Sequence, residues 1–315
     1  MEKKISLVII GAGYMAKEHI KAFSGLENVV ISGIHSRTSS RANDLASEFN
    51  IPNVCLTISE LFEKTNANAV IVTTPELETR DICLEIFKYP WTCLIEKPVG
   101  YNFEEAEFLH QRANDNKAKV FVALNRRHYG STLNVLEDLK LFPDKRILQI
   151  LDQEDLIGAR KAGQPELVVN NWMYANAIHI VDYMNIFLRG DVIDVQNILP
   201  WNKSDPSYVV SKILYSSGDI ALYQCMWNVP GPWAVTLTTR MRRWELRPLE
   251  QVAYQDFGQR KVIQIEKTKE DIDFKPGLRQ QAREFLKAIQ GMKHTLPDLS
   301  DALKSMNLIK KIYEL

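Results

Sequence analysis

The sequence predicts an α/β chain in two parts. The N-terminal part is a doubly wound parallel sheet, and a C-terminal α+β domain with a largely antiparallel, open-faced sheet follows it. Two patterns predict this: short apolar runs alternate with amphipathic helical stretches up to about residue 124, and longer strands of alternating polarity come after. We therefore expect domains at residues 1–124 and 125–315, with C-terminal helices that are free to pack back on the first domain.

In the first half, apolar strands alternate with helical crossovers, which is the order that builds a parallel sheet. Ligands of such sheets bind at the carboxyl ends of the strands. The predicted strands are Ile5–Ile10, Val29–Ile34, Val54–Leu56, Ala69–Thr73, Thr92–Glu96 and Lys119–Leu124. The predicted helices include Ser39–Phe49, Glu76–Lys88 and Phe103–Asn114.

In the second half, the strands are longer and short turns separate some of them, as antiparallel hairpins require. In the last predicted strand we expect Trp233, Val235, Leu237 and Met241 to share one face. The predicted strands are Ile147–Gln153, Val192–Leu199, Tyr208–Tyr215, Asp219–Trp227 and Trp233–Met241. The predicted helices are Ala177–Phe187, Gly277–Ile289 and Ser300–Tyr313.

Composition is that of an ordinary globular protein, with 45% hydrophobic and 25% charged residues and a formal net charge of zero. Nothing in it favours nucleic acid or a membrane as partner. The N-terminus lacks the apolar segment of a signal peptide, and four cysteines without C-x-x-C spacing read as reduced thiols, Cys55 and Cys93 as buried ones. We expect a cytoplasmic protein. Six scattered histidines show no metal-ligand spacing, so we expect no metal.

The most informative stretch is Val8–Ala16, where an apolar strand leads into G-x-G-x-x-A and a helix follows. Gly11 would make the tight turn, Gly13 would leave room for a pyrophosphate, and Ala16 would let helix and strand pack closely. The alternative is a glycine turn that only joins strand to helix. In the context of both flanking elements we predict a Rossmann dinucleotide site. Further cofactor contacts are expected from Tyr14, Met15, Thr73, Thr74 and Pro75.

The end of the second strand favours NADP over NAD. An acid at this position would bind a free 2′-hydroxyl, whereas an arginine accommodates a 2′-phosphate. The chain offers Ser36, Arg37 and Thr38, with Arg41 one helical turn later. Guanidinium pairs with phosphate in bidentate fashion, and the hydroxyls can donate to it. In the alternative interpretation Arg37 is a solvated cation that stacks on the adenine, and NAD binds as well.

The fifth strand ends in Glu96-Lys97-Pro98, and lysine is an unusual end for a buried apolar strand. Taken alone it fits a Glu96–Lys97 pair at a strand exit equally well. The order of G-x-G-x-x-A, Glu-Lys-Pro, Asn125-Arg126-Arg127 and a His-x-x-Asp helix resembles the glucose–fructose oxidoreductase / inositol dehydrogenase / rhizopine-catabolism (Gfo/Idh/MocA) family. The resemblance extends over nearly the whole chain.

The resemblance implies an oxidoreductase that acts on sugars, polyols or nucleotide-linked sugars with a pyridine nucleotide. It implies that Lys97 lies beside the nicotinamide, with Glu96 nearby, and holds the substrate oxygen. His179 matches the family's acid/base, with Asp182 three residues on. The family aspartate position holds Ala175, so Asn176, Tyr174 or a substrate carboxylate would have to take over its role. Substrate contacts are expected from Lys97, Asn125, Arg126, His128, Asn176 and His179.

We therefore predict hydride transfer between NADP, or NAD, and a hydroxyl or keto carbon of a carbohydrate. Members that act on nucleotide-linked sugars can lack the aspartate, which favours a biosynthetic carbohydrate. One alternative is a non-catalytic protein that senses the cofactor, and another is an enzyme that retains its cofactor and exchanges hydride between two sugars. The half-apolar open sheet face predicts a homodimer or homotetramer.

Overall fold

The computed structural model describes residues 4–315, and the chain divides into two compact units. The first unit runs to Asn125 and also takes in Asp273–Leu303. The second consists of Arg126–Ile272 and Lys304–Leu315. The residues 273–303, which lie in the second domain by our sequence boundary, thus cluster with the first. None of the helices within residues 4–315 combines the length and apolar character that a membrane span needs.

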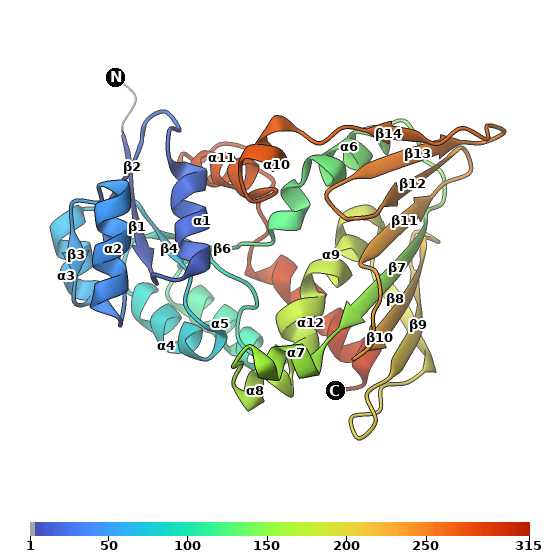
Figure 1. The fold of residues 1–315 in the computed structure, drawn as a ribbon, viewed down its shortest axis with the longest axis horizontal. Helices are drawn as coiled ribbons and strands as arrows, with labels where there is room; N and C mark the ends of the chain where they lie inside the picture. Colours follow the sequence, from blue (N-terminus) through green and yellow to red (C-terminus); the bar gives the residue numbers. More distant parts are fainter. Residues whose placement is uncertain (1–3) are drawn as a thin grey trace. The chain divides into compact units, whose positions relative to one another are not determined.

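The first unit contains a parallel six-stranded sheet in the order β3-β2-β1-β4-β5-β6 (Figure 1). The order reverses direction between β1 and β4, so right-handed crossovers place helices on both faces. The strands are β1 (Ile5–Ile10), β2 (Val29–His35), β3 (Val54–Cys55), β4 (Ala69–Val72), β5 (Thr92–Ile95) and β6 (Lys119–Val122). Strands β1, β4 and β5 are almost wholly buried, as continuous apolar runs between two helical layers should be.

Helices of this unit bury apolar stripes against the sheet. Phe285 on helix α11 packs edge-to-face on both Phe23 and Phe121, with ring centroids 6.2 and 6.4 Å apart, so α11 closes one face of the core. The helices are α1 (Tyr14–Phe23), α2 (Ser39–Phe49), α3 (Ile58–Thr65), α4 (Glu76–Ile86), α5 (Phe103–Asp115) and α11 (Leu278–Ile289). The short helix α10 (Lys269–Asp273) ends where the unit begins again.

The second unit contains an eight-stranded sheet in the order β14-β13-β12-β11-β7-β10-β9-β8. Its neighbours are antiparallel except for β7 and β10, which are parallel. The strands are β7 (Ile147–Glu154), β8 (Val192–Leu199), β9 (Tyr208–Tyr215), β10 (Ile220–Trp227), β11 (Ala234–Thr238), β12 (Arg242–Leu246), β13 (Val252–Asp256) and β14 (Ile263–Ile265). Alternate residues of β9 and β10 are buried, which gives the sheet one covered and one open face.

Helix α9 (Ile178–Phe187) packs against β7 and β11 on the covered face (Figure 1). A π-helical segment, η2 (Met173–Ala177), leads directly into α9, and π turns inside helices are frequently found at functional sites. The other helical elements are η1 (Asn125–His128), α6 (Gly130–Asp138), α7 (Leu156–Lys161), α8 (Glu166–Val169) and α12 (Leu299–Tyr313). Helix α12 passes from the first unit into the second at residues 303–304.

The predicted fold class is confirmed: a doubly wound parallel sheet precedes a mostly antiparallel one. The predicted strand Trp233–Met241 is too long at both ends. Strand β11 ends at Thr238, and a tight turn closed by the Thr239 amide on the Arg242 carbonyl starts β12. Met241 therefore lies in the turn with 48% of its surface exposed, and it does not share the face of Val235 and Leu237. The sequence analysis also missed β12, β13 and β14.

Candidate functional site

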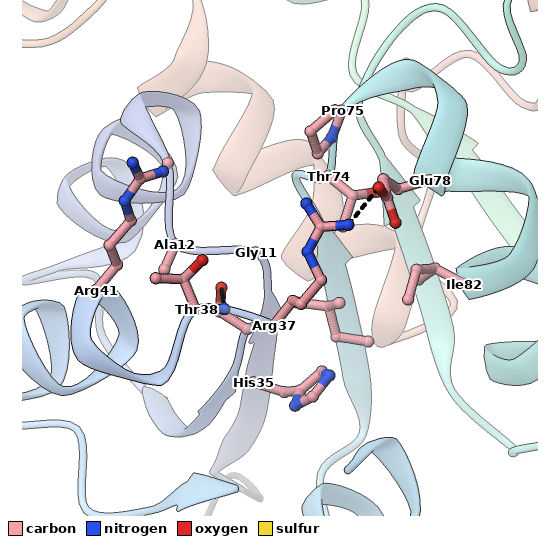
Figure 2. Close-up of a pocket in the computed structure, with 13 residues that line it drawn as sticks. Gly11, Ala12, His35, Arg37, Thr38, Arg41, Thr74, Pro75, Glu78 and Ile82 are labelled. Atoms are coloured by element: carbon pink, nitrogen blue, oxygen red, sulfur yellow. Dashed lines mark hydrogen bonds and ion pairs between the residues drawn. The ribbon is translucent and has the colours of Figure 1, made fainter. Parts of the chain in front are cut away.

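A pocket of about 170 Å³ opens at the carboxyl edge of the parallel sheet (Figure 2). It collects residues from the ends of β1, β2 and β4 and from the start of α4. Its lining residues are Ile10, Gly11, Ala12, Gly13, His35, Ser36, Arg37, Thr38, Arg41, Thr74, Pro75, Glu78 and Ile82. Eight of them were predicted cofactor contacts: Gly11, Gly13, Ser36, Arg37, Thr38, Arg41, Thr74 and Pro75.

The two glycines of the turn serve different purposes. Gly11 has φ +106°, and a Cβ built on it would lie 2.5 Å from Thr73 Oγ1 and 2.8 Å from the Thr73 carbonyl oxygen. Only glycine tolerates that backbone and that contact. At Gly13, no atom of the described chain lies within 4 Å of an added Cβ. The space beside Gly13 is therefore open to a ligand.

Helix α1 begins beside this open space. Gly13 is its N-cap and has no side chain with which to cap it, and the first turn reads Tyr14, Met15, Ala16 and Lys17, without an acid. The first amides of a helix lack partners within the helix and carry a partial positive charge. The open space beside Gly13, which has no Cβ, and a helix N-terminus without a capping side chain fit a pyrophosphate, which such turns bind through backbone amides.

The other predicted cofactor contacts near the glycine turn pack against it or lie outside the pocket lining. Ala16 is fully buried and lets α1 approach β1. Thr73 donates its backbone amide and its hydroxyl to the Ile10 carbonyl, so it braces the turn and is absent from the pocket lining. Tyr14 is 66% exposed, and the Lys275 ammonium lies 5.3 Å from its ring centroid. Met15 packs against the core cluster of this unit.

The cations at the end of β2 line the pocket, and one of them has an acidic partner. Arg37 donates from Nη1 to Glu78 Oε1 at 2.5 Å, across the pocket from β2 to α4 (Figure 2). Arg41 lies on the first turn of α2, and Ser36 Oγ accepts from the Thr38 amide. The sequence analysis missed Glu78 and Ile82; the signal was their spacing of three and seven residues after Pro75 on the helix that follows it.

The Glu96 side chain connects the end of β5 to helix α1. Its Oε1 lies 2.7 Å from His19 Nε2 on α1, and His19 is 1% exposed. Its Oε2 accepts from the backbone amide of Lys97. Lys97 is half-buried directly after the strand, and neither Glu96 nor Lys97 lines the pocket described above. The sequence analysis missed His19, whose signal was its position three residues after Ala16.

The predicted substrate residues at 125–128 divide between the two units. Asn125 is buried in the first unit, where its side-chain amide donates to the Pro276 carbonyl. Arg126 belongs to the second unit, and its guanidinium stacks on Trp233 with 4.2 Å to the ring centroid. His128 is 1% exposed in the second unit. Contact of these residues with a substrate stays a prediction.

His179 is half-buried on the first turn of α9, and Asp182 below it anchors the helix. Arg127 donates from Nε and Nη2 to the two oxygens of Asp182, both at 2.7 Å. Ser305 Oγ donates to Asp182 Oδ1 at 2.7 Å. Asp182 is therefore a structural anchor. Lys97 lies in the first unit and His179 in the second, so their convergence on one carbon stays a prediction.

A buried acidic network lies beneath the π turn. Glu154 Oε2 accepts from the Asn176 side-chain amide at 2.8 Å, and Tyr223 donates to Asp152 Oδ2 at 2.6 Å. Both carboxyls are fully buried. Burial raises the pKa of Asp152 to about 6, although the hydrogen bond from Tyr223 opposes the rise. The sequence carried a signal for these acids: Asp152 and Glu154 continue the otherwise apolar face of Leu148 and Ile150.

Ala175 is buried in η2, so the family's carboxylate position is occupied by a small apolar side chain. Asn176, one of the three replacements that the sequence left open, donates its side-chain amide to the buried Glu154. Among residues 4–315, no group of three or more His, Cys, Asp or Glu side chains is placed to hold a metal ion.

Together the glycine turn, the bare helix start and the cations after β2 define the class of this protein, which carries a Rossmann domain of the dinucleotide-binding type. Residues 5–124 match the family model described as "Oxidoreductase family, NAD-binding Rossmann fold", named for Gfo, Idh and MocA. The resemblance to this family inferred from the sequence is confirmed by this match over residues 5–124.

Curated relatives match part of the chain. Oxidoreductase P35 of Formosa agariphila is 27% identical over 149 residues, which are 47% of this chain and 45% of that protein. Inositol 2-dehydrogenase of Rhizobium meliloti is 24% identical over 133 residues, 41% of this chain and 40% of that protein. The chain thus spans about half the length of these relatives or less.

Solved structures resemble the whole fold. UDP-N-acetylglucosamine 3-dehydrogenase from Acidithiobacillus ferrooxidans has a TM-score of 0.79 at 15% identity, over 98% of this chain and 97% of that one. At this identity the likeness shows the fold alone. Both domains, including the open-faced sheet, therefore have a counterpart in a known architecture.

Proposed function

We propose that the protein is an NADP-preferring oxidoreductase that transfers hydride between the nicotinamide and a hydroxyl or keto carbon of a sugar, polyol or nucleotide-linked sugar. The observation that carries this proposal is the pocket at the sheet edge. One side of it is lined by the glycine turn, which suits a pyrophosphate, and another by the arginines after β2, which suit the phosphorylated ribose of the adenosine. The match of residues 5–124 to the NAD-binding oxidoreductase family model supports it.

The chain's own residues fit a dinucleotide at this pocket. Gly11 and Gly13 with the start of α1 would hold the pyrophosphate. Arg37 and Arg41, with the hydroxyls of Ser36 and Thr38, would hold a 2′-phosphate. The preference for NADP rests on these four side chains and on the absence of an acid at the end of β2.

Lys97 and His179 would perform the acid–base chemistry. When bound, the nicotinamide supplies the hydride acceptor for oxidation or the donor for reduction. Lys97 would donate to the substrate oxygen and stabilise the negative charge that develops on it. His179 would take the hydroxyl proton in oxidation and return it in reduction, a role that suits an imidazole near neutral pH.

The substrate class rests on the relatives and on Ala175. Inositol 2-dehydrogenase is among the relatives, and a UDP-sugar dehydrogenase shares the fold. Ala175 lies one helical turn before His179, and it offers no carboxylate there to orient or polarise the imidazole. We favour a nucleotide-linked sugar, because family members that act on such substrates can lack this aspartate.

The test is hydride transfer with a panel of inositols, hexoses, sugar phosphates and nucleotide sugars, each with NADP and NAD, followed by nicotinamide absorbance. K97M and H179A should lose turnover and keep cofactor affinity within twofold of the parent protein. Near-normal rates in either variant would remove that residue from the mechanism.

One observation favours a second candidate, a cofactor-binding regulatory protein without catalysis: the buried Ala175 in place of the family aspartate. Retention of Lys97 and His179 favours the enzyme. Tight NADPH binding without hydride transfer to any compound of the panel would favour the regulatory protein.

We also propose that a second copy of the chain covers the open face of the eight-stranded sheet. On this face Leu151, Val210, Leu214, Leu222 and Met226 are half-buried, and Lys212 is the charge that β9 and β10 contribute. The part of this face formed by β9 and β10 therefore carries little charge, and it can pair with its own copy with little like-charge repulsion. Light scattering should report a dimer or tetramer, and L214E/L222E should dissociate it; a monomeric parent protein would contradict the proposal.

The four cysteines are free and buried, which fits a reducing compartment, so we place the protein's action in the cytoplasm.

A further inference from the structure

The pocket contains an ion pair that no cofactor-binding turn requires. Arg37 comes from the loop after β2, and Glu78 comes from the first turn of α4, 41 residues further along the chain. Arg37 Nη1 and Glu78 Oε1 are 2.5 Å apart, and Figure 2 shows the two side chains reaching toward one another. Among the residues that line the pocket, Glu78 is the carboxylate, and Arg37 is its partner.

Glu78 accepts a hydrogen bond from Arg37 Nη1, a donor that a 2′-phosphate would also use. A phosphate monoester carries a charge near −2 and binds guanidinium through two parallel hydrogen bonds. Glu78 already accepts from one nitrogen of Arg37, so phosphate and carboxylate compete for it. A free 2′-hydroxyl is uncharged and does not enter this competition.

The pair is exposed enough to exchange partners. The side chains of Arg37 and Glu78 are 79% and 46% exposed, and ion pairs of this kind contribute little to stability. A dianionic phosphate can therefore displace the carboxylate at modest cost. The displaced Glu78 still lies near the phosphate, since α4 holds its backbone at the pocket, and repulsion between the two charges weakens binding further.

We propose that Glu78 is a specificity-determining residue, which competes with the 2′-phosphate of NADP for Arg37 and so sets the ratio of NADP to NAD affinity. This inference rests on the proposed function only in that the pocket takes the adenosine end of a pyridine dinucleotide. Arg37 supplies the preference for NADP, and Glu78 limits its size.

The test is titration of the full-length protein with NADPH and NADH, followed by nicotinamide fluorescence. E78Q should bind NADPH about tenfold more tightly, because the amide cannot compete with phosphate for a cation, and should bind NADH within twofold of the parent protein. R37M should lose most of the NADPH preference. In the R37M background, adding E78Q should change NADPH affinity by no more than threefold.

Glu76 provides a matched control. It lies on the same first turn of α4 and carries the same charge, but it does not line the pocket. E76Q should leave the ratio of NADPH to NADH affinity within twofold. An equal effect of E76Q and E78Q on this ratio, or equal tightening of both nucleotides by E78Q, would overturn the inference. Failure of the parent protein to bind either nucleotide would instead overturn the proposed function.

Discussion

Two arginine–carboxylate pairs, one in each unit, differ mainly in exposure. Arg37 and Glu78 meet at the rim of a pocket with side chains 79% and 46% exposed. Arg127 and Asp182 meet inside the second unit with 16% and 3% exposed, and Ser305 adds a third hydrogen bond. Water screens the first pair, so a ligand can take one partner. Little water reaches the pair of Arg127 and Asp182, so water cannot take the place of a lost partner. This pair holds α9, the helix that carries His179, in position.

The largest effect should come from breaking the buried pair. Asp182→Asn removes the carboxylate that pairs with the Arg127 guanidinium in the interior, and loss of one partner from such a pair typically costs about 3–5 kcal/mol of stability. Glu78→Gln, the same change in the exposed pair, should cost less than about 1 kcal/mol. Urea unfolding of both variants measures the difference. Equal losses would show that exposure does not distinguish the two pairs.

The two glycines of the phosphate turn should separate stability from binding. Gly11→Ala forces a Cβ into contact with Thr73 at a positive φ and should cost on the order of 2 kcal/mol of stability. Gly13→Ala meets no atom of the described chain and has an ordinary extended backbone, so stability should be unchanged while affinity for both nucleotides falls at least tenfold. Thermal unfolding without ligand and nucleotide titration test both expectations. Unchanged affinity in Gly13→Ala would place the pyrophosphate elsewhere.

The buried acidic network should make stability depend on pH. The pKa of Asp152 is raised from 3.8 to about 6, so the folded state holds this proton more tightly than the unfolded chain. The contribution is complete below about pH 4 and is lost as pH rises through about 6. The groups around the carboxyl are Tyr223, Glu154 and, further away, Arg126.

Asp152→Asn should flatten this part of the stability profile, because an amide does not titrate. Urea midpoints measured between pH 4.5 and 7 would show the loss of slope relative to the parent protein. An identical slope in the variant would assign the dependence to another group.

The local pattern of apolar and polar residues was sufficient to predict most strands and helices of the first unit. Strand Ile5–Ile10 and helix Ser39–Phe49 have the predicted bounds, and the glycine turn lies where G-x-G-x-x-A placed it. Each depends on the periodicity or backbone of neighbouring residues. Strand β12 was missed because it begins with the charged Arg242, whose partners Asp138 and Asp256 come from other segments of the chain.

The site residues that we missed have partners far away in the chain. Glu78 lies 41 residues from Arg37, and His19 lies 77 residues from Glu96. The acids on β7 looked like the end of an apolar face. Whether an acid is a solvated surface group or a buried anchor depends on what packs over it, and no local pattern records that.

The sequence by itself determined the alternation of strands and helices, the phosphate turn and the cations that follow β2, because side-chain period and glycine geometry act over a few residues. The tertiary structure alone decided which charges are neutralised: Arg37 by Glu78 at the pocket rim, and Arg127 by Asp182 in the interior. Electrostatic energies depend on distance and on exclusion of water, and both are set only when remote segments pack together.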